Sequence, residues 1–290
     1  MSEHLFVDYH FHPNFNFRSR RIGRRSGRIW NAFEKAELDI VICSEHCWKR
    51  PAESYHRMID SRPEDARTTL LPGVEILTSE GIDIVVFGHC PSWYEDTHLG
   101  ECLEPYSTSL DAVIDHVVDS KDASGFIPHP YTAGQTGVIK HFGRDGSRAL
   151  ASRLGAIETS NNAFADTLSF TNWLGPKMFP KTQEKMILTQ QLDEGFASDL
   201  ELDFVAVGSD AHCPREIGYG VHLEIGERPK TVEEAFRAML TNQNAMGVDK
   251  FKAGIMRKAR RATQSAGTTL KEFLEKRSIQ RKQRREQDRD

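Results

Sequence analysis

The stretch Gly208-Ser209-Asp210-Ala211-His212-Cys213-Pro214 follows the apolar run Phe204 to Val207. A short apolar run that ends at a glycine predicts a buried strand closed by a turn. Such a strand would present Asp210 and His212 at the edge of a sheet. A carboxylate and an imidazole two residues apart can both bind a divalent cation. This pair also occurs by chance, so its meaning depends on how the other strands of the chain end.

Six further runs predict strands, and most of them end in the same way. They cover Leu5 to Tyr9, Leu38 to Cys43, Thr69 to Ile76, Ile82 to Phe87, Gly125 to Pro128 and Ala156 to Thr159. The first five runs and the run before Gly208 lead into, or contain, a His, Glu or Asp. These residues are His10 and His12, His46, Glu75, His89, His129, and Asp210 with His212. Six such placements favour a multi-histidine metal centre over chance.

The segments between these runs indicate how the strands are connected. Apolar periodicity predicts helices over residues 29–37, 109–120, 181–194 and 232–240. Strands separated by helical stretches predict repeated β-α units and a mainly parallel sheet. In parallel barrels the carboxyl ends of the strands form the active-site face. On a strand, alternate side chains share a face, so His10 and His12 are predicted to bind one cation together.

Composition excludes several classes of protein. The chain has 290 residues, with 38% hydrophobic and 28% charged residues, which is typical of a globular domain. No apolar stretch is long enough to span a membrane, and the N-terminus lacks the apolar core of a signal peptide. Five cysteines without framework spacing favour reduced thiols. We therefore expect a cytoplasmic protein that does not contact membranes.

Positive charge is concentrated near the two ends of a chain whose net charge is −4. Residues 18–28 contain six arginines, and residues 249–290 contain 14 Lys and Arg against 6 Asp and Glu. Such asymmetry indicates an anionic partner. We expect one domain over residues 1–248, followed by a basic helical tail over 249–290 that is partly disordered, with its end at 281–290 solvated. Leu270, Phe273 and Leu274 would dock one turn of this tail, which also offers a surface for a protein partner or self-association.

The order of these motifs resembles the PHP family, the polymerase and histidinol phosphatase phosphoesterases. The resemblance rests on His-x-His, Glu-His, Pro-Gly-x-Glu, Gly-His, His-Pro and Ser-Asp-Ala-His, and it spans roughly residues 5–225. It implies a distorted (β/α)7 barrel of PHP type, here with a C-terminal helical, basic extension. It also implies two or three divalent ions at the strand ends.

The resemblance also implies a ligand set. One ion would be bound by His10, His12, Glu75 and Asp210, and Glu75 would bridge to a second ion bound by His89 and His129. His46 and His212 would bind a third ion. Imidazole and carboxylate ligands suit Zn, Mn or Fe, and Mg is an alternative.

The chemistry of such a centre follows from its ligands. Two neighbouring cations bind the attacking and leaving oxygens of a phosphate ester and lower the pKa of bound water, so the nucleophile is a metal-bridged hydroxide. Glu75, Asp210 and His212 are the predicted catalytic residues. Guanidinium matches phosphate bidentately, so Arg21, Arg24, Arg25 and Arg215 are predicted to bind substrate.

Several functions remain open at this level. The basic segments favour a nucleotide or nucleic-acid phosphodiester as substrate, which would make the protein a nuclease. A small phosphorylated molecule, cleaved by a phosphomonoesterase of the histidinol-phosphatase type, is the alternative. A non-catalytic, metal-stabilised binding module is a hypothesis from another class, and ligand identity alone also allows redox or deaminase chemistry.

Overall fold

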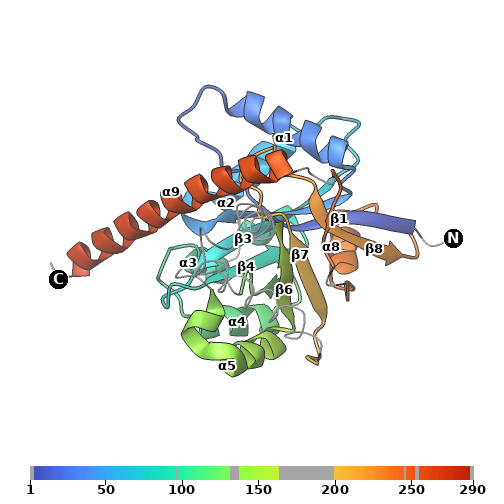
Figure 1. Cartoon of the computed structure of the whole chain (residues 1–290). Helices are drawn as coiled ribbons and strands as arrows, with labels where there is room; N and C mark the ends of the chain where they lie inside the picture. Colours follow the sequence, from blue (N-terminus) through green and yellow to red (C-terminus); the bar gives the residue numbers. More distant parts are fainter. Residues whose placement is uncertain are drawn as a thin grey trace.

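The computed structural model describes residues 3–95, 97–130, 137–162, 199–244, 246–251 and 255–287 (Figure 1). The helix expected over 181–194 lies outside these ranges. All seven predicted strands are present. They are β1 (Glu3–Phe11), β2 (Ile40–His46), β3 (Thr69–Leu77), β4 (Asp83–Gly88), β5 (Ala123–Phe126), β6 (Ala156–Asn161) and β7 (Phe204–Gly208). Two more strands, β8 (Tyr219–Ile225) and β9 (Val248–Asp249), were not predicted.

The strands form two sheets. The larger sheet has the order β5-β4-β3-β2-β1-β8-β9, and β6 pairs with β7 in a separate parallel sheet. Only β1 with β2 and β2 with β3 are parallel pairs in the larger sheet. Its other described pairs are antiparallel. Isolated bridges at Phe11–Ala211 and Ile127–Ile157 connect the two sheets.

The prediction of a distorted (β/α)7 barrel is therefore wrong: the described strands form a mixed, mostly antiparallel sheet that does not close. One reason is the short connection between β3 and β4. Residues 78–82 turn back on themselves, with Ile82 O accepting from the Thr78 amide at 2.9 Å and Gly81 at a φ of 82°. A parallel crossover needs a dozen or more residues, so this connection can only make an antiparallel pair.

Helices cover the outer faces of the sheets. They are α1 (Ile22–Ala36), α2 (Pro51–Asp60), α3 (Thr97–Cys102), α4 (Leu110–Asp119), α5 (Val138–Leu154), α8 (Val232–Met239) and α9 (Ile255–Gln287). The helices predicted over 29–37, 109–120 and 232–240 correspond to α1, α4 and α8. Helix α1 begins earlier than expected, so the second half of the arginine run is helical.

The core has three parts that follow from this layering. Helix α1 packs Ile29, Trp30 and Phe33 against one face of the larger sheet. Helix α4 buries its apolar face against residues of β3 and β4. Between the two sheets lie aromatic side chains that include Tyr9 and Phe204, whose rings stack at 5.9 Å. This burial supplies the main stabilisation and leaves the carboxyl ends of β1, β2 and β3 free for polar residues.

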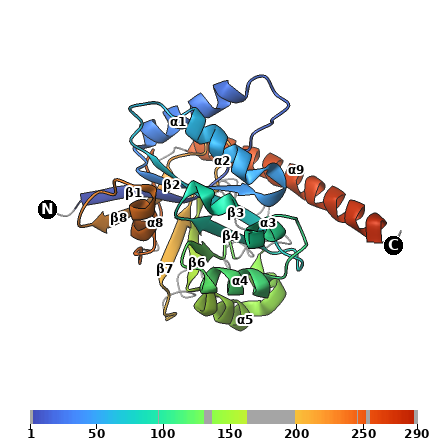
Figure 2. The same cartoon turned by 180° about the vertical axis from the view of Figure 1, so that it is seen from behind.

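Helix α9 crosses the body of the fold, and its C-terminal part extends beyond it (Figures 1 and 2). Leu270, Phe273 and Leu274 are 60%, 39% and 58% exposed, so the prediction that they dock a helical turn is wrong. Polar residues of α9 face the rest of the chain instead. The structure describes a helix as far as Gln287, into the segment expected to be solvated. No helix in the described ranges has both the length and the apolar character needed to cross a membrane.

Candidate metal centre

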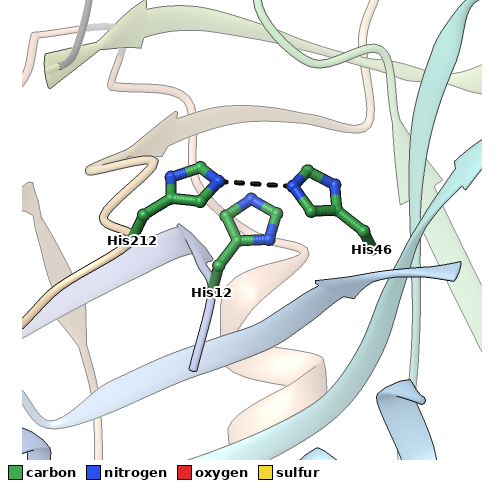
Figure 3. A group of neighbouring side chains, drawn as sticks. All are labelled: His12, His46 and His212. Atoms are coloured by element: carbon green, nitrogen blue, oxygen red, sulfur yellow. Dashed lines mark hydrogen bonds between the residues drawn. The ribbon is translucent and has the colours of Figure 1, made fainter. Parts of the chain in front are cut away.

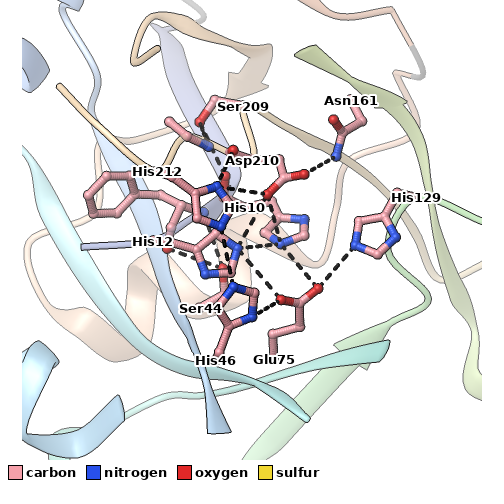
Figure 4. Close-up of polar contacts among 12 residues, drawn as sticks. His10, His12, Ser44, His46, Glu75, His129, Asn161, Ser209, Asp210 and His212 are labelled. Atoms are coloured by element: carbon pink, nitrogen blue, oxygen red, sulfur yellow. Dashed lines mark hydrogen bonds and ion pairs between the residues drawn. The ribbon is translucent and has the colours of Figure 1, made fainter. Parts of the chain in front are cut away.

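The three adjacent strands β1, β2 and β3 run in the same direction, so their carboxyl ends meet at one edge. His46 at the end of β2 is paired in register with Glu75 of β3. The end of β7 reaches the same place, because Phe11 bridges to Ala211 and the His12 amide donates to Ala211 O at 3.0 Å. This arrangement brings together the predicted ligands His10, His12, His46, Glu75, Asp210 and His212 (Figure 4).

His129 joins this cluster and His89 does not. Strand β4 is antiparallel to both β3 and β5, so β5 ends at the same edge as β3 and delivers His129 to Glu75. Strand β4 itself ends at the opposite edge. There, His89 Nδ1 lies 3.0 Å from Asp122 O, and the His89 ring belongs to none of the ligand groups among the described residues. The assignment of His89 as a metal ligand is wrong.

His10, His12 and Asp210 form the first group that could bind an ion. The Nε2 atoms of His10 and His12 lie 3.0 Å apart, and Asp210 Oδ1 lies 3.4 Å from His12 Nε2. His10 Nδ1 lies 3.2 Å from the carboxylate Oε1 of Glu158, which favours a proton on Nδ1 and a lone pair on Nε2. An Nε2 lone pair buried against a second imidazole nitrogen requires a cation or a shared proton there.

Glu75 is the centre of the second group, with His10 and His129. Its Oε1 atom lies 3.0 Å from His129 Nε2 and 3.8 Å from His10 Nε2. Its Oε2 atom lies 2.5 Å from His46 Nδ1, but neither of these two buried atoms has a hydrogen-bond partner of good geometry. The two oxygens of Glu75 thus face different groups, as expected for a bridging carboxylate.

His12, His46 and His212 form the third group (Figure 3). The Nε2 atoms of His46 and His212 lie 3.3 Å apart, and the rings of both stack on His12 at 4.3 Å. His12 Nε2 faces His10 and Asp210, whereas the Nε2 atoms of His46 and His212 face each other in this outer group. Trp48 stacks on His46 at 4.4 Å and limits its access to water.

Sequence reasoning missed four residues that support the ligands. Glu158 accepts the His129 amide at 2.6 Å and faces His10, and Asn161 donates to Asp210 Oδ2 at 3.4 Å. Buried Asp8 accepts the amides of His10 and Ser209, and Glu45 lies 3.7 Å from His12 Nδ1. A carboxylate inside an apolar strand was a usable signal for Glu158, as it was for Glu75, because an unpaired buried charge is unstable. A fifth missed residue, Glu272, comes from helix α9.

The predicted substrate-binding arginines differ in exposure. Arg21, Arg24 and Arg215 are exposed at the surface. Arg25 is partly buried, and it donates to the carbonyl of Pro13 at 2.8 Å and to that of His212 at 2.6 Å. Arg25 therefore ties the loops after β1 and β7 together, and this is a positioning role.

In the absence of a metal, the neighbouring charges hold Glu75 ionised and His12 and His129 protonated, as their pKa values show. Burial opposes the charged form of His12, but the neighbouring carboxylates of Asp210 and Glu45 raise the pKa of His12 to about 10. His129 is buried in the same way, and Glu75 raises its pKa to about 9. Despite burial, His46 and His129 hold the pKa of Glu75 well below its usual range. The carboxylates thus require positive charge, which protons or metal ions can supply.

The donor set fits divalent ions. Imidazole nitrogens and carboxylate oxygens are the ligands of Zn, Mn and Fe sites. Each of the three groups offers one ligand atom per residue within a span of 4.8 Å. The buried Glu75 Oε2 and His46 Nδ1 atoms lack hydrogen bonds of their own. The residues present therefore fit the coordination of divalent ions.

We expect the metal-free protein to lose thermal stability as the pH rises from about 6.5 to 10. The pKa values of about 10 for His12 and about 9 for His129 exceed the usual value of 6.5. Their protonation therefore stabilises the fold fully below about pH 6.5, and this contribution disappears as pH rises through the folded-state values. Melting temperatures measured with chelator across this range should fall more steeply than those of metal-loaded protein, where ions replace the protons. If the melting temperatures of metal-free and metal-loaded protein fell in parallel with pH, the stabilising protonation of His12 and His129 would be contradicted.

No protein-family model matches the chain, and no curated protein matches it. Among solved structures, the crystal structure of PsfC from Pseudomonas syringae PB-5123 matches with a TM-score of 0.59. The match covers 95% of this chain and 99% of PsfC, at 16% sequence identity. At this identity the similarity concerns the fold, because unrelated functions share folds. The chain thus shares its overall fold with PsfC over nearly its whole length.

Proposed function

We propose that the protein is a metal-dependent hydrolase of phosphate esters, related to the PHP phosphoesterases that its motifs resemble. The observation that carries the proposal is the position of Glu75. This carboxylate is 2% exposed, and its oxygens face His129 and His10 on one side and His46 on the other. A carboxylate shared between adjacent histidine groups is the arrangement that holds two cations close together.

The residues of the chain would act by holding these groups in place. Ions bound here would polarise a phosphoryl oxygen and activate water for attack. Glu158 orients His10 through Nδ1, so that Nε2 faces the cluster. Asn161 contacts Oδ2 of Asp210, which leaves Oδ1 directed at His10 and His12. No Ser or Cys nucleophile is required.

The accessibility of the cluster favours a small phosphate ester over a polynucleotide. The side chains of His10, His12, Glu75 and His46 are at most 4% exposed, and Asp210 and His212 reach only 18% and 10%. Helix α9 lies beside this entrance through Glu272, which contacts His46 and His212. A small ester fits such limited access, whereas a polynucleotide needs an open, positively charged groove.

The test is hydrolysis of phosphate monoesters and oligonucleotides by the purified protein, with Zn, Mn and Mg added in turn. Turnover of a monoester with at least one metal is expected. Cleavage of oligonucleotides alone would favour the nuclease alternative. Stoichiometric metal binding without turnover of either class would favour a metal-stabilised binding module.

We expect substitution of the exposed Arg21 and Arg24 to have a different effect from substitution of the partly buried Arg25. Arg21→Ala with Arg24→Ala should leave monoester hydrolysis unchanged, because both side chains are exposed and neither has a hydrogen bond or ion pair to the cluster among the described contacts. Arg25→Ala removes two hydrogen bonds from a charged donor, each contributing about 1.5–3 kcal/mol, and should lower turnover and thermal stability together. If the substrate is a polynucleotide, the double variant should instead bind oligonucleotides more weakly, and this binding should depend less on salt concentration. Steady-state kinetics and melting curves measure both effects.

A further inference from the structure

Helix α9 places the carboxylate of Glu272 against the outer group of the centre. Its Oε1 atom lies 2.8 Å from His46 Nε2 and 2.9 Å from His212 Nε2. The same oxygen lies 3.1 Å from Lys49 Nζ. Only 13% of the Glu272 side chain is exposed. A residue more than 50 positions beyond Asp210 in sequence is thus buried among the predicted ligands.

Polar contacts on both sides of Glu272 hold α9 in this position. Lys276 forms an ion pair with buried Asp83 at 2.9 Å, and its ammonium group lies 5.1 Å from the centre of the Trp48 ring. Further along, Gln283 donates to Pro105 O at 2.7 Å. Before Glu272, Arg261 pairs with Asp249 at 3.2 Å. Leu270, Phe273 and Leu274 are exposed, whereas these polar contacts join α9 to the rest of the described chain on both sides of Glu272.

The three atoms fit the coordination shell of one ion. A cation about 2.0–2.1 Å from each ligand atom separates neighbouring ligands by about 2.8–3.4 Å, for angles between 90° and the tetrahedral value. The separations among His46 Nε2, His212 Nε2 and Glu272 Oε1 are 2.8, 2.9 and 3.3 Å. His12, the remaining member of the outer group, directs its Nε2 atom at His10 and Asp210. Glu272 Oε1 therefore offers a third ligand atom beside His46 Nε2 and His212 Nε2.

We propose that Glu272 is a metal ligand, and that helix α9 completes the outer site together with His46 and His212. The inference rests on the proposed metal centre and adds a ligand that lies outside the span of the family motifs. It gives the basic C-terminal segment a specific role: the segment carries one acidic side chain into the centre. The competing explanation is that Glu272 only accepts hydrogen bonds from His46 and His212, without binding an ion.

The experiment measures metal binding by the full chain. Protein stripped with chelator is titrated with Zn and with Co(II), and bound equivalents, affinity and the Co(II) visible spectrum are recorded. Glu272→Gln should lower the affinity for one ion by at least about 10- to 100-fold. This is the range observed when only a residue that supports a ligand is lost. It should also change the Co(II) spectrum, because the ligand set differs. Glu272→His offers a nitrogen ligand without negative charge. It should restore the binding of this ion and give a Co(II) spectrum that differs from that of the wild type.

Glu275→Gln is the matched control. It removes the same charge from the same helix, at a side chain that lies 3.4 Å from Trp48 Nε1, and metal binding should be unchanged. The proposal is overturned if wild type and Glu272→Gln bind the same equivalents with the same affinity and spectrum. It is also overturned if Glu272→Gln loses the ion and Glu272→His does not restore it, because this pattern indicates a requirement for charge. Wild-type protein that binds no ion would instead overturn the proposed function itself.

Discussion

Replacing Glu75 by Gln is expected to abolish phosphate-ester hydrolysis while leaving the protein folded. The amide keeps the size of the side chain but cannot bridge two cations, so the groups around His129 and His46 lose their shared ligand. We expect turnover to fall by at least about 10³-fold, equivalent to about 4 kcal/mol of transition-state stabilisation. Elemental analysis should show the loss of at least one bound ion, and circular dichroism should show unchanged secondary structure.

Glu53→Gln is a suitable control for this variant. Glu53 is an exposed carboxylate of α2 that pairs with Arg50, so its loss should leave metal content and turnover unchanged. Near-normal turnover of Glu75→Gln with metal in excess would contradict the proposed centre. A loss of turnover with full metal content would instead assign Glu75 to the chemistry and not to metal binding.

The second large effect is expected from a pair of histidine variants. His129→Ala should lose an ion and most of the turnover, because His129 Nε2 lies 3.0 Å from Glu75 Oε1. His89→Ala should retain both, since His89 lies at the other edge of the sheet and contacts the backbone of Asp122. The expected difference is at least about 10²-fold in turnover, equivalent to about 2.7 kcal/mol. Steady-state kinetics and metal analysis on both variants measure it.

The variants His129→Ala and His89→Ala together test whether His129 belongs to the centre and His89 does not. The motif order assigns His89 and His129 to the same ion, whereas the direction of β4 separates them. Similar losses in both variants would show that His89 also reaches the centre. Retention of metal and turnover by His129→Ala would remove His129 from the ligand set.

Much of the centre could be predicted from the sequence, because its information is local. Each strand is a short apolar run, and a polar residue placed directly after it lies at the end of that strand wherever the strand packs. His10, His12, His46, Asp210 and His212 lie at or just after such an end, and Glu75 lies inside β3 near its carboxyl end. The structure brings all six together. Their residue types also indicate the chemistry, since imidazole and carboxylate groups bind transition metals in any fold.

The direction of each strand was decided by tertiary structure. A mainly parallel barrel was expected from the alternation of strands and helices, but the turn after β3 reverses the chain and makes β4 antiparallel. Strands β8 and β9 add two more antiparallel pairs. Pairing direction depends on which strands meet across the sheet. The apolar composition of a run does not indicate whether it pairs in a parallel or an antiparallel direction. The mixed sheet therefore could not be read from the apolar runs themselves. The connection between β3 and β4 is the exception, because residues 78–82 are too few for a parallel crossover, and their number already indicated that His89 lies at the other edge.

The residues that reach the centre from elsewhere also depend on tertiary structure. Glu272 lies in a charged helix, where nothing in the local pattern distinguishes it from Glu275. Its position follows from the ion pair of Lys276 with Asp83, two residues 193 positions apart. Glu158 stands out in sequence as a carboxylate inside an apolar run, but only its distance to His10 identifies it as a supporting residue of the centre. The sequence by itself determined which strand ends carry ligands, because that property is local. Only the tertiary structure decided which ends meet and that helix α9 contributes a carboxylate, because those contacts join distant segments.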